Sequence, residues 1–380
     1  MIKILLLIDY SSEFDRKLLR GLVQYSKENG PWLFYRLPSY YSTMHGEQGI
    51  LRWAKEWKAD AIIGQWNNDT IDLQKELNIP VVLQNYHHRS VTYSNLTGDY
   101  KGTGRMAAQF FAKRMFRNFA YFGVKGVVWS DERCEGYRQE VKRIGGEFFS
   151  FESDKQEDEI RMEVSQWLQQ LPKPVALFCC DDAHALFISE TCKMTNIPIP
   201  EEIALLGVDN DELMCNISDP PISSIELEVE RGGYSIGRLI HQQIKKEHEG
   251  TFNIVINPIR IELRQSTEKH NIKDPYILEV VKYIDSHYSS DLTIESLLAN
   301  IPLSRRNFEV KFKNALNTSI YQYILNCRCN HLADLLLTTD RPLADLAMEV
   351  GFTDYNIARI FKKFKGCSPI EYRQKKTRQR

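Results

Sequence analysis

The sequence has no apolar run of 18 residues, no CxxC pair among its eight cysteines and no large net charge, which is −1 over 380 residues. The first absence excludes a membrane-spanning helix, and the second excludes the spacing of a zinc site or a disulfide framework. The short apolar run at residues 4–8 is followed by Asp9 and a charged segment instead of a signal-peptide cleavage site. We therefore expect a cytoplasmic protein with reduced cysteines, no bound metal and no cofactor.

The balanced net charge conceals a separation of charge along the chain. Residues 305–380 contain 15 Lys and Arg against 7 Asp and Glu, a surplus of eight positive charges, which leaves residues 1–304 with nine net negative charges. A basic end attached to an acidic remainder is typical of a module that binds a polyanion joined to a module with another task. At this length, two or three domains are expected.

Residues 1–267 alternate between apolar, strand-like runs and helical patterns. The strand-like runs lie at residues 2–9, 32–37, 59–66, 79–85, 118–124, 146–152, 174–180 and 202–209. Alternation at this interval predicts βαβ crossovers and parallel sheets. Because the runs form two successive series, we predict an α/β fold with two lobes and a cleft at the carboxyl ends of the strands.

Polar side chains gather where these predicted strands end. They are Asp9, Tyr10, Gln65, Trp66, Asn85, Asp181, Asp182, Asp209 and Asn210. Any single carboxylate among them is explained equally well as a helix N-cap. Together, carboxylate and amide groups beside a flat aromatic ring have the composition of a sugar site, where hydroxyl groups need paired partners.

Five segments in this region share a pattern with known regulators. They are "DYKGTGRMAAQFF" at 99–111, "DERCEGYRQEV" at 131–141, "FCCDDAHA" at 178–185, "LLGVDNDELMCNISDPPISSIELEVERGGYSIGRLI" at 205–240 and "PIRIELRQST" at 258–267. This pattern resembles the effector domain of the LacI/GalR regulators, which is similar to periplasmic sugar-binding proteins of type I. The resemblance implies that Arg133, the pair Asp181 and Asp182, and Asp209 hold a small effector.

The segment "GTGRMA" at 102–107 also matches the GxGxxA pattern of dinucleotide-binding loops. Such a loop needs a strand that leads into the glycines and an acidic residue that ends a second strand about 20 residues later. The sequence shows neither clearly. We expect these glycines to open a helix instead.

A second domain is predicted to begin with Asp274 as an N-cap and Pro275 in the first helical position. We place an effector domain at 1–267, a linker at 268–274 and the second domain at 275–380. The side chains expected to pack its first helix are Ile277, Val280, Val281 and Ile284.

Two helix-turn-helix patterns follow, at about 292–316 and 342–365. Phe308, Phe312 and Leu316 recur every four residues and predict a buried stripe in the first. In the second, Gly351 occupies the turn, while Ile357, Phe361 and Phe364 face inward. The side chains expected to contact DNA are Arg305, Arg306, Glu309, Val310, Lys313, Tyr355, Asn356, Arg359, Lys362 and Lys363.

The segments "SRRNFEVKFKNAL", "LADLAMEVGF" and "RIFKKFKGCSP" resemble the DNA-binding domain of the AraC/XylS family. In that family the two units enter successive major grooves on one face of double-stranded DNA. The resemblance implies that residues 276–373 share this fold and this mode of binding.

An effector domain ahead of an AraC/XylS-type domain resembles the xylose-responsive, XylR-type regulators. The resemblance implies a transcription regulator that activates genes of pentose catabolism in response to D-xylose, forms a homodimer and contacts RNA polymerase. We expect no enzymatic activity and no membrane contact. The alternatives are a repressor that responds to another sugar and a sugar-processing enzyme that uses Asp181 and Asp182 as an acid–base pair. An alkyl-transferring repair regulator would need a zinc-bound cysteine cluster that the sequence lacks.

Overall fold

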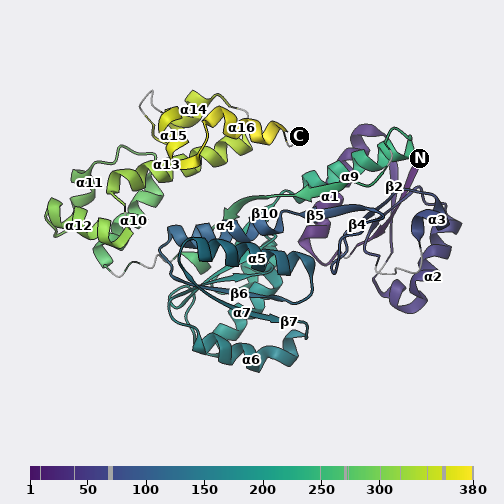
Figure 1. The fold of residues 1–380 in the computed structure, drawn as a ribbon, viewed down its shortest axis with the longest axis horizontal. Coiled ribbons are helices and arrows are strands. Elements are labelled where there is room, and N and C mark those ends of the chain that lie inside the picture. Colours follow the sequence, from purple (N-terminus) through teal and green to yellow (C-terminus); the bar gives the residue numbers. More distant parts are fainter. Residues whose placement is uncertain are drawn as a thin grey trace. The chain divides into compact units, whose positions relative to one another are not determined.

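The computed structural model describes residues 1–8, 10–37, 39–66, 72–248, 250–268, 272, 274–299, 301–316, 318–339, 341–352 and 357–378. The chain divides into two compact units, Met1–Lys269 and His270–Arg380 (Figure 1). The first unit contains two sheets covered by helices, and the described part of the second is helical.

The first sheet of unit 1 is parallel, with the strand order β11-β5-β4-β3-β1-β2. Its strands are β1 (Ile2–Leu7), β2 (Trp32–Arg36), β3 (Ala61–Gly64), β4 (Val81–Leu83), β5 (Ser94–Gly98) and β11 (Asn253–Ile256). Helices α1 (Glu13–Asn29) and α9 (Val229–Ile244) cover one face, and α2 (Ser39–Trp57) and α3 (Leu73–Leu77) lie by the other (Figure 1). We call this assembly the N-lobe.

The apolar run at the N-terminus is buried on both faces of this sheet, as parallel strands require. Alternate residues of β1 enter different clusters: Ile4 and Leu6 pack with Leu18 on α1, whereas Leu5 packs with Ala54 on α2. All three β1 residues are at most 1% exposed. The continuous apolar pattern is therefore explained by a strand that has helices on both sides.

The second sheet of unit 1 has the order β12-β10-β9-β8-β6-β7. Its strands are β6 (Asn118–Val124), β7 (Glu147–Ser153), β8 (Val175–Cys179), β9 (Ile203–Val208), β10 (Ser223–Leu227) and β12 (Pro258–Glu262). Its helices are α4 (Tyr100–Lys113), α5 (Val128–Arg143), α6 (Glu157–Gln170), α7 (Asp182–Met194) and α8 (Glu212–Ile217), with a 3-10 turn η1 (Gln265–Thr267). We call this assembly the C-lobe.

The predicted α/β arrangement with parallel sheets is confirmed, but four strands at one side of the two sheets were missed. Strands β5, β10, β11 and β12 were not predicted, and β12 pairs with β10 in the antiparallel sense. The lobes also exchange chain segments, because β11 joins the N-lobe sheet late in the sequence and β12 then returns to the C-lobe. Two successive series of strands therefore describe the lobes only in part.

Strand β5 escaped prediction because it is polar and yet buried. Ser94, Asn95 and Thr97 are each at most 7% exposed, and Asn95 Nδ2 donates to Asn253 Oδ1 at 2.9 Å. A strand does run into the glycines of the GxGxxA pattern, contrary to our expectation. Those glycines nevertheless open α4, as expected, and Asp99 Oδ1 caps it by accepting from Gly102 N at 2.8 Å.

Glycines allow α4 and α5 to cross with their backbones in contact. A Cβ atom added at Gly104 would lie 2.1 Å from Arg133 O and 2.6 Å from Tyr137 N. A Cβ atom added at Gly136 would lie 2.1 Å from Lys101 O. Any larger residue would push the helices apart, so this crossing fixes the backbone of α5 at Arg133.

Unit 2 contains the two predicted helix-turn-helix units. Its helices are α10 (Pro275–His287), α11 (Ile294–Leu298), α12 (Arg305–Leu316), α13 (Ile320–Thr338), α14 (Leu343–Glu349), α15 (Ile357–Lys365) and α16 (Pro369–Arg378). Asp274 caps α10 by accepting from Tyr276 N at 3.1 Å, and Pro275 occupies its first turn, as predicted. The predicted stripe on α10 is buried, and so are Phe308, Phe312 and Leu316 on α12.

The turn before α15 has the predicted glycine. Gly351 has φ +87°, and a Cβ atom there would lie 2.6 Å from Ser289 O. Both the left-handed backbone and the close approach require glycine. Phe361 is fully buried, while Ile357 and Phe364 are partly buried. The predicted contact residues Tyr355 and Asn356 lie outside the described residues.

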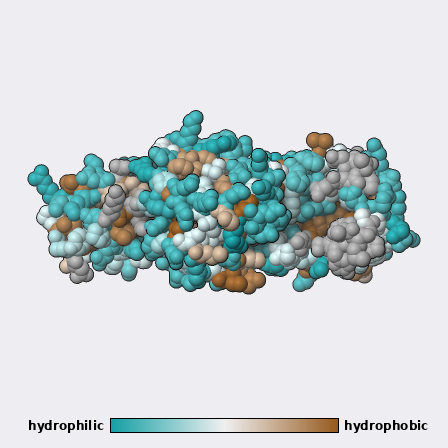
Figure 2. Space-filling view, turned by 90° about the horizontal axis from the view of Figure 1, so that it is seen from below, coloured by the Kyte–Doolittle hydropathy of each residue, from teal (hydrophilic) through white to brown (hydrophobic). Residues whose placement is uncertain are grey.

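Hydrophilic residues predominate on the face of the molecule in Figure 2, and the hydrophobic residues there form small, separate groups. Among the helices that the structure describes, none is long and apolar enough to cross a membrane. This finding agrees with the lack of long apolar runs in the sequence.

Substituting Gly104 tests the crossing of α4 and α5. We expect Gly104→Ala to lower the free energy of unfolding by about 1–3 kcal/mol, because overpacking against the α5 backbone outweighs the better helix propensity of alanine. Arg105→Ala, on the exposed side of the same helix, is the control and should change stability by less than about 0.5 kcal/mol. Equal urea midpoints for the two variants would contradict the close crossing.

Candidate functional site

Arg133 lies on α5 with its side chain inside the C-lobe, and the residue is only 3% exposed. Its Nη1 donates a hydrogen bond to the carbonyl oxygen of Cys180, which directly follows β8. Its guanidinium carbon lies 5.6 Å from the ring centre of Tyr100 and 5.4 Å from that of Trp129. Two aromatic rings and one carbonyl group therefore hold the cation.

Asp209 follows β9 and faces this arginine. Its Oδ1 lies 3.7 Å from Arg133 Nη2, an ion-pair distance that is too long for a hydrogen bond. Burial raises the pKa of the Asp209 carboxyl to about 6, although the nearby guanidinium of Arg133 opposes this rise. The resemblance to the LacI/GalR effector domain implies that these two residues share one site, and the structure brings them together across 76 positions of sequence.

Two atoms of this pair have unused hydrogen-bonding capacity. Arg133 Nε and Asp209 Oδ1 are buried, and no described residue forms a hydrogen bond with either atom. A buried polar atom without a partner costs about 1–3 kcal/mol. A ligand that accepts from Nε and donates to Oδ1 would remove that cost, and a sugar hydroxyl group has both capacities.

Asp181 caps α7, which was the alternative explanation of this carboxylate. Its Oδ1 accepts from His184 N at 2.8 Å and contacts His184 Nδ1 at 2.7 Å. Burial alone would raise the pKa of Asp181, but the charge and hydrogen bonds of His184 lower it below its usual value. Asp181 is therefore ionised at neutral pH, and its contacts to His184 use only Oδ1.

The side chains of Cys180, Asp181 and His184 present metal-binding atoms that lie within 4.8 Å of one another. A search for CxxC spacing could not find such a group. Its hydrogen bonds are satisfied internally, because Asp181 Oδ1 already has two partners from His184. Burial raises the pKa of the Cys180 thiol, which keeps it protonated. We assign this group to holding Asp181 in place.

Asp182 and Asn210 were expected in the effector site, but their side chains support the turn that carries Asp209. Asp182 Oδ2 accepts from Asp211 N at 2.7 Å, and its Oδ1 accepts from Ser224 Oγ at 2.6 Å. Asn210 donates to Glu226 at 2.5 Å and accepts from Arg264 Nη2 at 2.8 Å. Burial, followed by the charge of Asp209, raises the pKa of Asp182 well above its usual value.

The side chains expected to bind the effector from the N-lobe are largely covered by other protein atoms. Trp66 is 4% exposed and packs in the core with Leu5 and Leu83, so protein atoms cover the ring that was expected to stack on a sugar. Trp66 N donates to Asn85 Oδ1 at 3.0 Å. Tyr10 is partly buried, burial raises its pKa to about 12, and Arg36 lies 4.9 Å from its ring centre. Asp9 lies outside the described residues.

The two lobes contact each other through segments that follow the carboxyl ends of their strands, where the sequence predicts a cleft. After β4, the carbonyl of Tyr86 accepts from Val128 N at 2.8 Å, and the ring of Tyr86 packs edge to face on Trp129. Nearby, Arg89 binds Glu132 through two hydrogen bonds of 2.6 and 2.8 Å. Trp129 and Tyr100 are the aromatic residues that lie over the Arg133 guanidinium. Neither was predicted in the site, because neither ends a predicted strand.

In unit 2, the predicted contact side chains on α12 are exposed. They are Arg305, Arg306, Glu309, Val310 and Lys313. Arg305 is not free, because it binds Glu295 at 2.7 Å and Glu309 at 3.1 Å. These exposed ion pairs are weak and can be exchanged for contacts with a polyanion.

The described predicted side chains on α15, Arg359, Lys362 and Lys363, are exposed as well. Lys363 Nζ donates to Gln322 on α13 at 2.8 Å. Phe361 anchors the opposite face of α15 in the core. The helix therefore presents a basic surface, which is the charge that a nucleic-acid backbone requires.

Comparison with known proteins agrees with this two-part architecture. Residues 108–267 match the model of a periplasmic binding protein-like domain, and residues 297–375 match that of a helix-turn-helix domain. The xylose operon regulatory protein of Escherichia coli K12 is 24% identical over 98% of this chain and 96% of its own length. The protein of the same name from Haemophilus influenzae is also 24% identical, over 98% of both chains.

A solved structure has the same fold over nearly the whole chain. The structure of the xylose-binding transcription activator xylR superposes with a TM-score of 0.60 and 22% sequence identity, and it covers 98% of this chain and 97% of that one. Together with the domain matches, these findings identify the chain as a transcription regulator, homologous over almost its whole length to the xylose operon regulatory proteins.

Proposed function

We propose that this regulator binds D-xylose between its two lobes and, in response, activates genes of pentose catabolism. The observation that carries the proposal is the buried pair of Arg133 and Asp209, whose Nε and Oδ1 atoms lack hydrogen-bond partners among the described residues. The choice of D-xylose over other sugars is supported by the names of the full-length relatives.

The chemistry of the site suits a polyhydroxylated ligand. Arg133 supplies donors, and the carboxylates of Asp209 and Asp181 supply acceptors. Trp129 and Tyr100 flank the cation and offer apolar ring surface. Charge-assisted hydrogen bonds with apolar contact on the carbon skeleton are the usual means of binding a small sugar.

The DNA-binding half of the proposal rests on the helix-turn-helix match and the exposed basic side chains of α12 and α15. We assign these helices to successive major grooves of the duplex. Two chains acting as a homodimer in the cytoplasm would contact four grooves, and activation would require contact with RNA polymerase. Effector binding regulates the chain only if the sugar favours one lobe arrangement over another.

The effector affinity should depend on pH through Asp209. The sugar hydroxyl prefers the ionised carboxylate, whose pKa is about 6 in the free protein. Affinity should therefore rise as pH increases through 6 and fall below it. Calorimetry should show that Asp209→Asn loses about 1.5–3 kcal/mol of binding free energy at pH 8 and becomes insensitive to pH. Asp154→Asn, at an exposed turn, serves as the control. An unchanged pH profile in Asp209→Asn would remove Asp209 from the site.

A screen of pentoses and hexoses by thermal shift tests the identity of the effector. D-xylose should raise the unfolding temperature most, because a ligand at 100 times its Kd adds about 2.7 kcal/mol of stability. A shift caused by a hexose alone would contradict the assignment to xylose, while sugar binding itself would stand.

Arg359 and Lys363 should have separable effects on DNA binding. A planar guanidinium on the exposed face of α15 suits a guanine edge, whereas a lysine near the helix end suits phosphate. Arg359→Ala should cost about 1–3 kcal/mol on the operator and relax sequence preference. Lys363→Ala should weaken binding to all sequences alike and lower the salt slope by about one. Binding titrations of both variants on operator and scrambled DNA measure these effects. An equal loss of affinity for both DNAs in Arg359→Ala would show that Arg359 does not read bases.

A further inference from the structure

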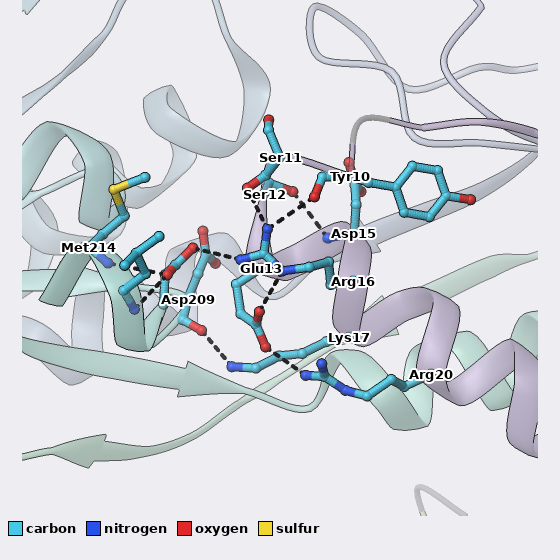
Figure 3. A network of polar contacts seen from close by, with 12 residues as sticks. Tyr10, Ser11, Ser12, Glu13, Asp15, Arg16, Lys17, Arg20, Asp209 and Met214 are labelled. Atoms are coloured by element: carbon cyan, nitrogen blue, oxygen red, sulfur yellow. Dashed lines mark hydrogen bonds and ion pairs between the residues drawn. The ribbon is translucent and has the colours of Figure 1, made fainter. Parts of the chain in front are cut away.

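Lys17 is a nearly buried lysine that reaches from one lobe to the other. It lies on α1 of the N-lobe and is 8% exposed. Its Nζ donates to Asp209 O at 2.7 Å (Figure 3). It also donates to Glu226 Oε1 at 2.9 Å and lies 3.4 Å from Asn210 O. The three acceptors belong to the C-lobe, at the end of β9 and on β10.

The backbone that Lys17 holds is strained. Asp209 has φ +98° and Asn210 has φ +49°, so two consecutive residues with side chains adopt left-handed conformations. Such residues cost about 1–3 kcal/mol each and persist where surrounding contacts over-determine them. Here the carbonyl oxygens of both residues point at one ammonium group, while Asn210 N donates to Ser224 Oγ at 3.0 Å.

The neighbouring Arg16 extends the same connection. Its Nη1 donates to Tyr10 O at 3.0 Å and Ser11 O at 2.6 Å (Figure 3). Its Nη2 lies 3.2 Å from Asp211 Oδ2. Asp211 in turn caps α8. Each residue of the turn 209–211 is thus bound by a cation from the first two turns of α1. One of these cations, Arg16, also binds the segment that leads out of β1.

We propose that Lys17 is a positioning residue for the effector site, which holds the turn 209–211 so that Asp209 Oδ1 faces Arg133 and which couples effector binding to the contact between the lobes. This inference rests on the proposed function, because it assigns the effector to Asp209. We call the contacts of Lys17 with the turn 209–211 the clamp. Coupling is reciprocal: if the clamp favours the conformation of the turn that binds the effector, the bound effector strengthens the clamp.

A purely structural lysine would behave differently. Loss of a buried ion pair strands the Glu226 carboxylate, and this lowers stability whatever the role of the turn. Lys17→Met combined with Glu226→Gln removes the stranded charge. If Lys17 acts only as a partner of Glu226, the double variant regains effector affinity. If Lys17 holds the carbonyl groups of the turn, the double variant regains stability but not affinity.

The experiment compares the full chain with Lys17→Met, with the double variant and with Lys27→Met, an exposed lysine on the same helix. Calorimetry with D-xylose should show affinity reduced about tenfold or more in the first two variants, and within twofold of the parent in Lys27→Met. Amide hydrogen exchange without sugar should become faster at residues 209–211 in the first two variants and stay unchanged in Lys27→Met.

The two readouts separate the failure of this inference from failure of the proposed function. If the parent chain binds D-xylose and Lys17→Met binds it equally well, the positioning role is overturned while the function stands. If the parent chain binds no sugar, the proposed function fails. Amide exchange then decides on the clamp itself, because unchanged exchange at residues 209–211 in Lys17→Met would overturn it as well.

Discussion

The Arg133 guanidinium is buried in the C-lobe, and much of the surrounding structure is arranged around that charge. The close crossing of α4 and α5 at their glycines fixes the position of Arg133 on α5. The Cys180 carbonyl and the rings of Tyr100 and Trp129 contact its guanidinium. Asp209 faces it at 3.7 Å without completing a hydrogen bond. An ion pair that is close yet incompletely hydrogen-bonded is costly in isolation, and this cost supports our proposal that the pair binds a ligand.

Many hydrogen bonds hold the turn 209–211, which carries Asp209, in place. Asp182, Ser224, Arg264 and Glu226 all bind its backbone or the side chain of Asn210. Lysine and arginine from the other lobe complete the support. Because the proposed acceptor and the contact between the lobes share one turn, a ligand bound at Asp209 would change the free energy of the lobe contact as well. Such sharing gives a sensor a physical route from ligand binding to lobe arrangement.

Much of the fold could be predicted from the sequence, because its apolar patterns are strong. The runs in β1, β6, β8 and β9 are continuous, and the phenylalanines of α12 recur with helical spacing. Strand β5 could not be predicted, since its buried residues are polar and some of their hydrogen bonds are made with Phe252 and Asn253, 158 positions away. Local sequence does not contain that information.

The candidate site could be predicted only in part, for the same reason. Residue type and position at strand ends identified Asp181, Asp182 and Asp209 as a group, but tertiary hydrogen bonds distinguish their roles. Both carboxylate oxygens of Asp182 accept hydrogen bonds, from Asp211 N and Ser224 Oγ, whereas Asp209 Oδ1 has no hydrogen-bond partner among the described residues. Likewise, Trp66 ends a predicted strand and Trp129 does not, and only packing shows that the first fills a core and the second lies beside Arg133.

A crystal structure of the chain grown with D-xylose would test the central claim most directly. The account predicts a sugar oxygen within about 2.7–3.2 Å of both Arg133 Nε and Asp209 Oδ1, or one oxygen at each. It also predicts that Lys17 keeps its hold on the turn 209–211. Xylose bound elsewhere, with Arg133 Nε and Asp209 Oδ1 still without partners, would contradict it.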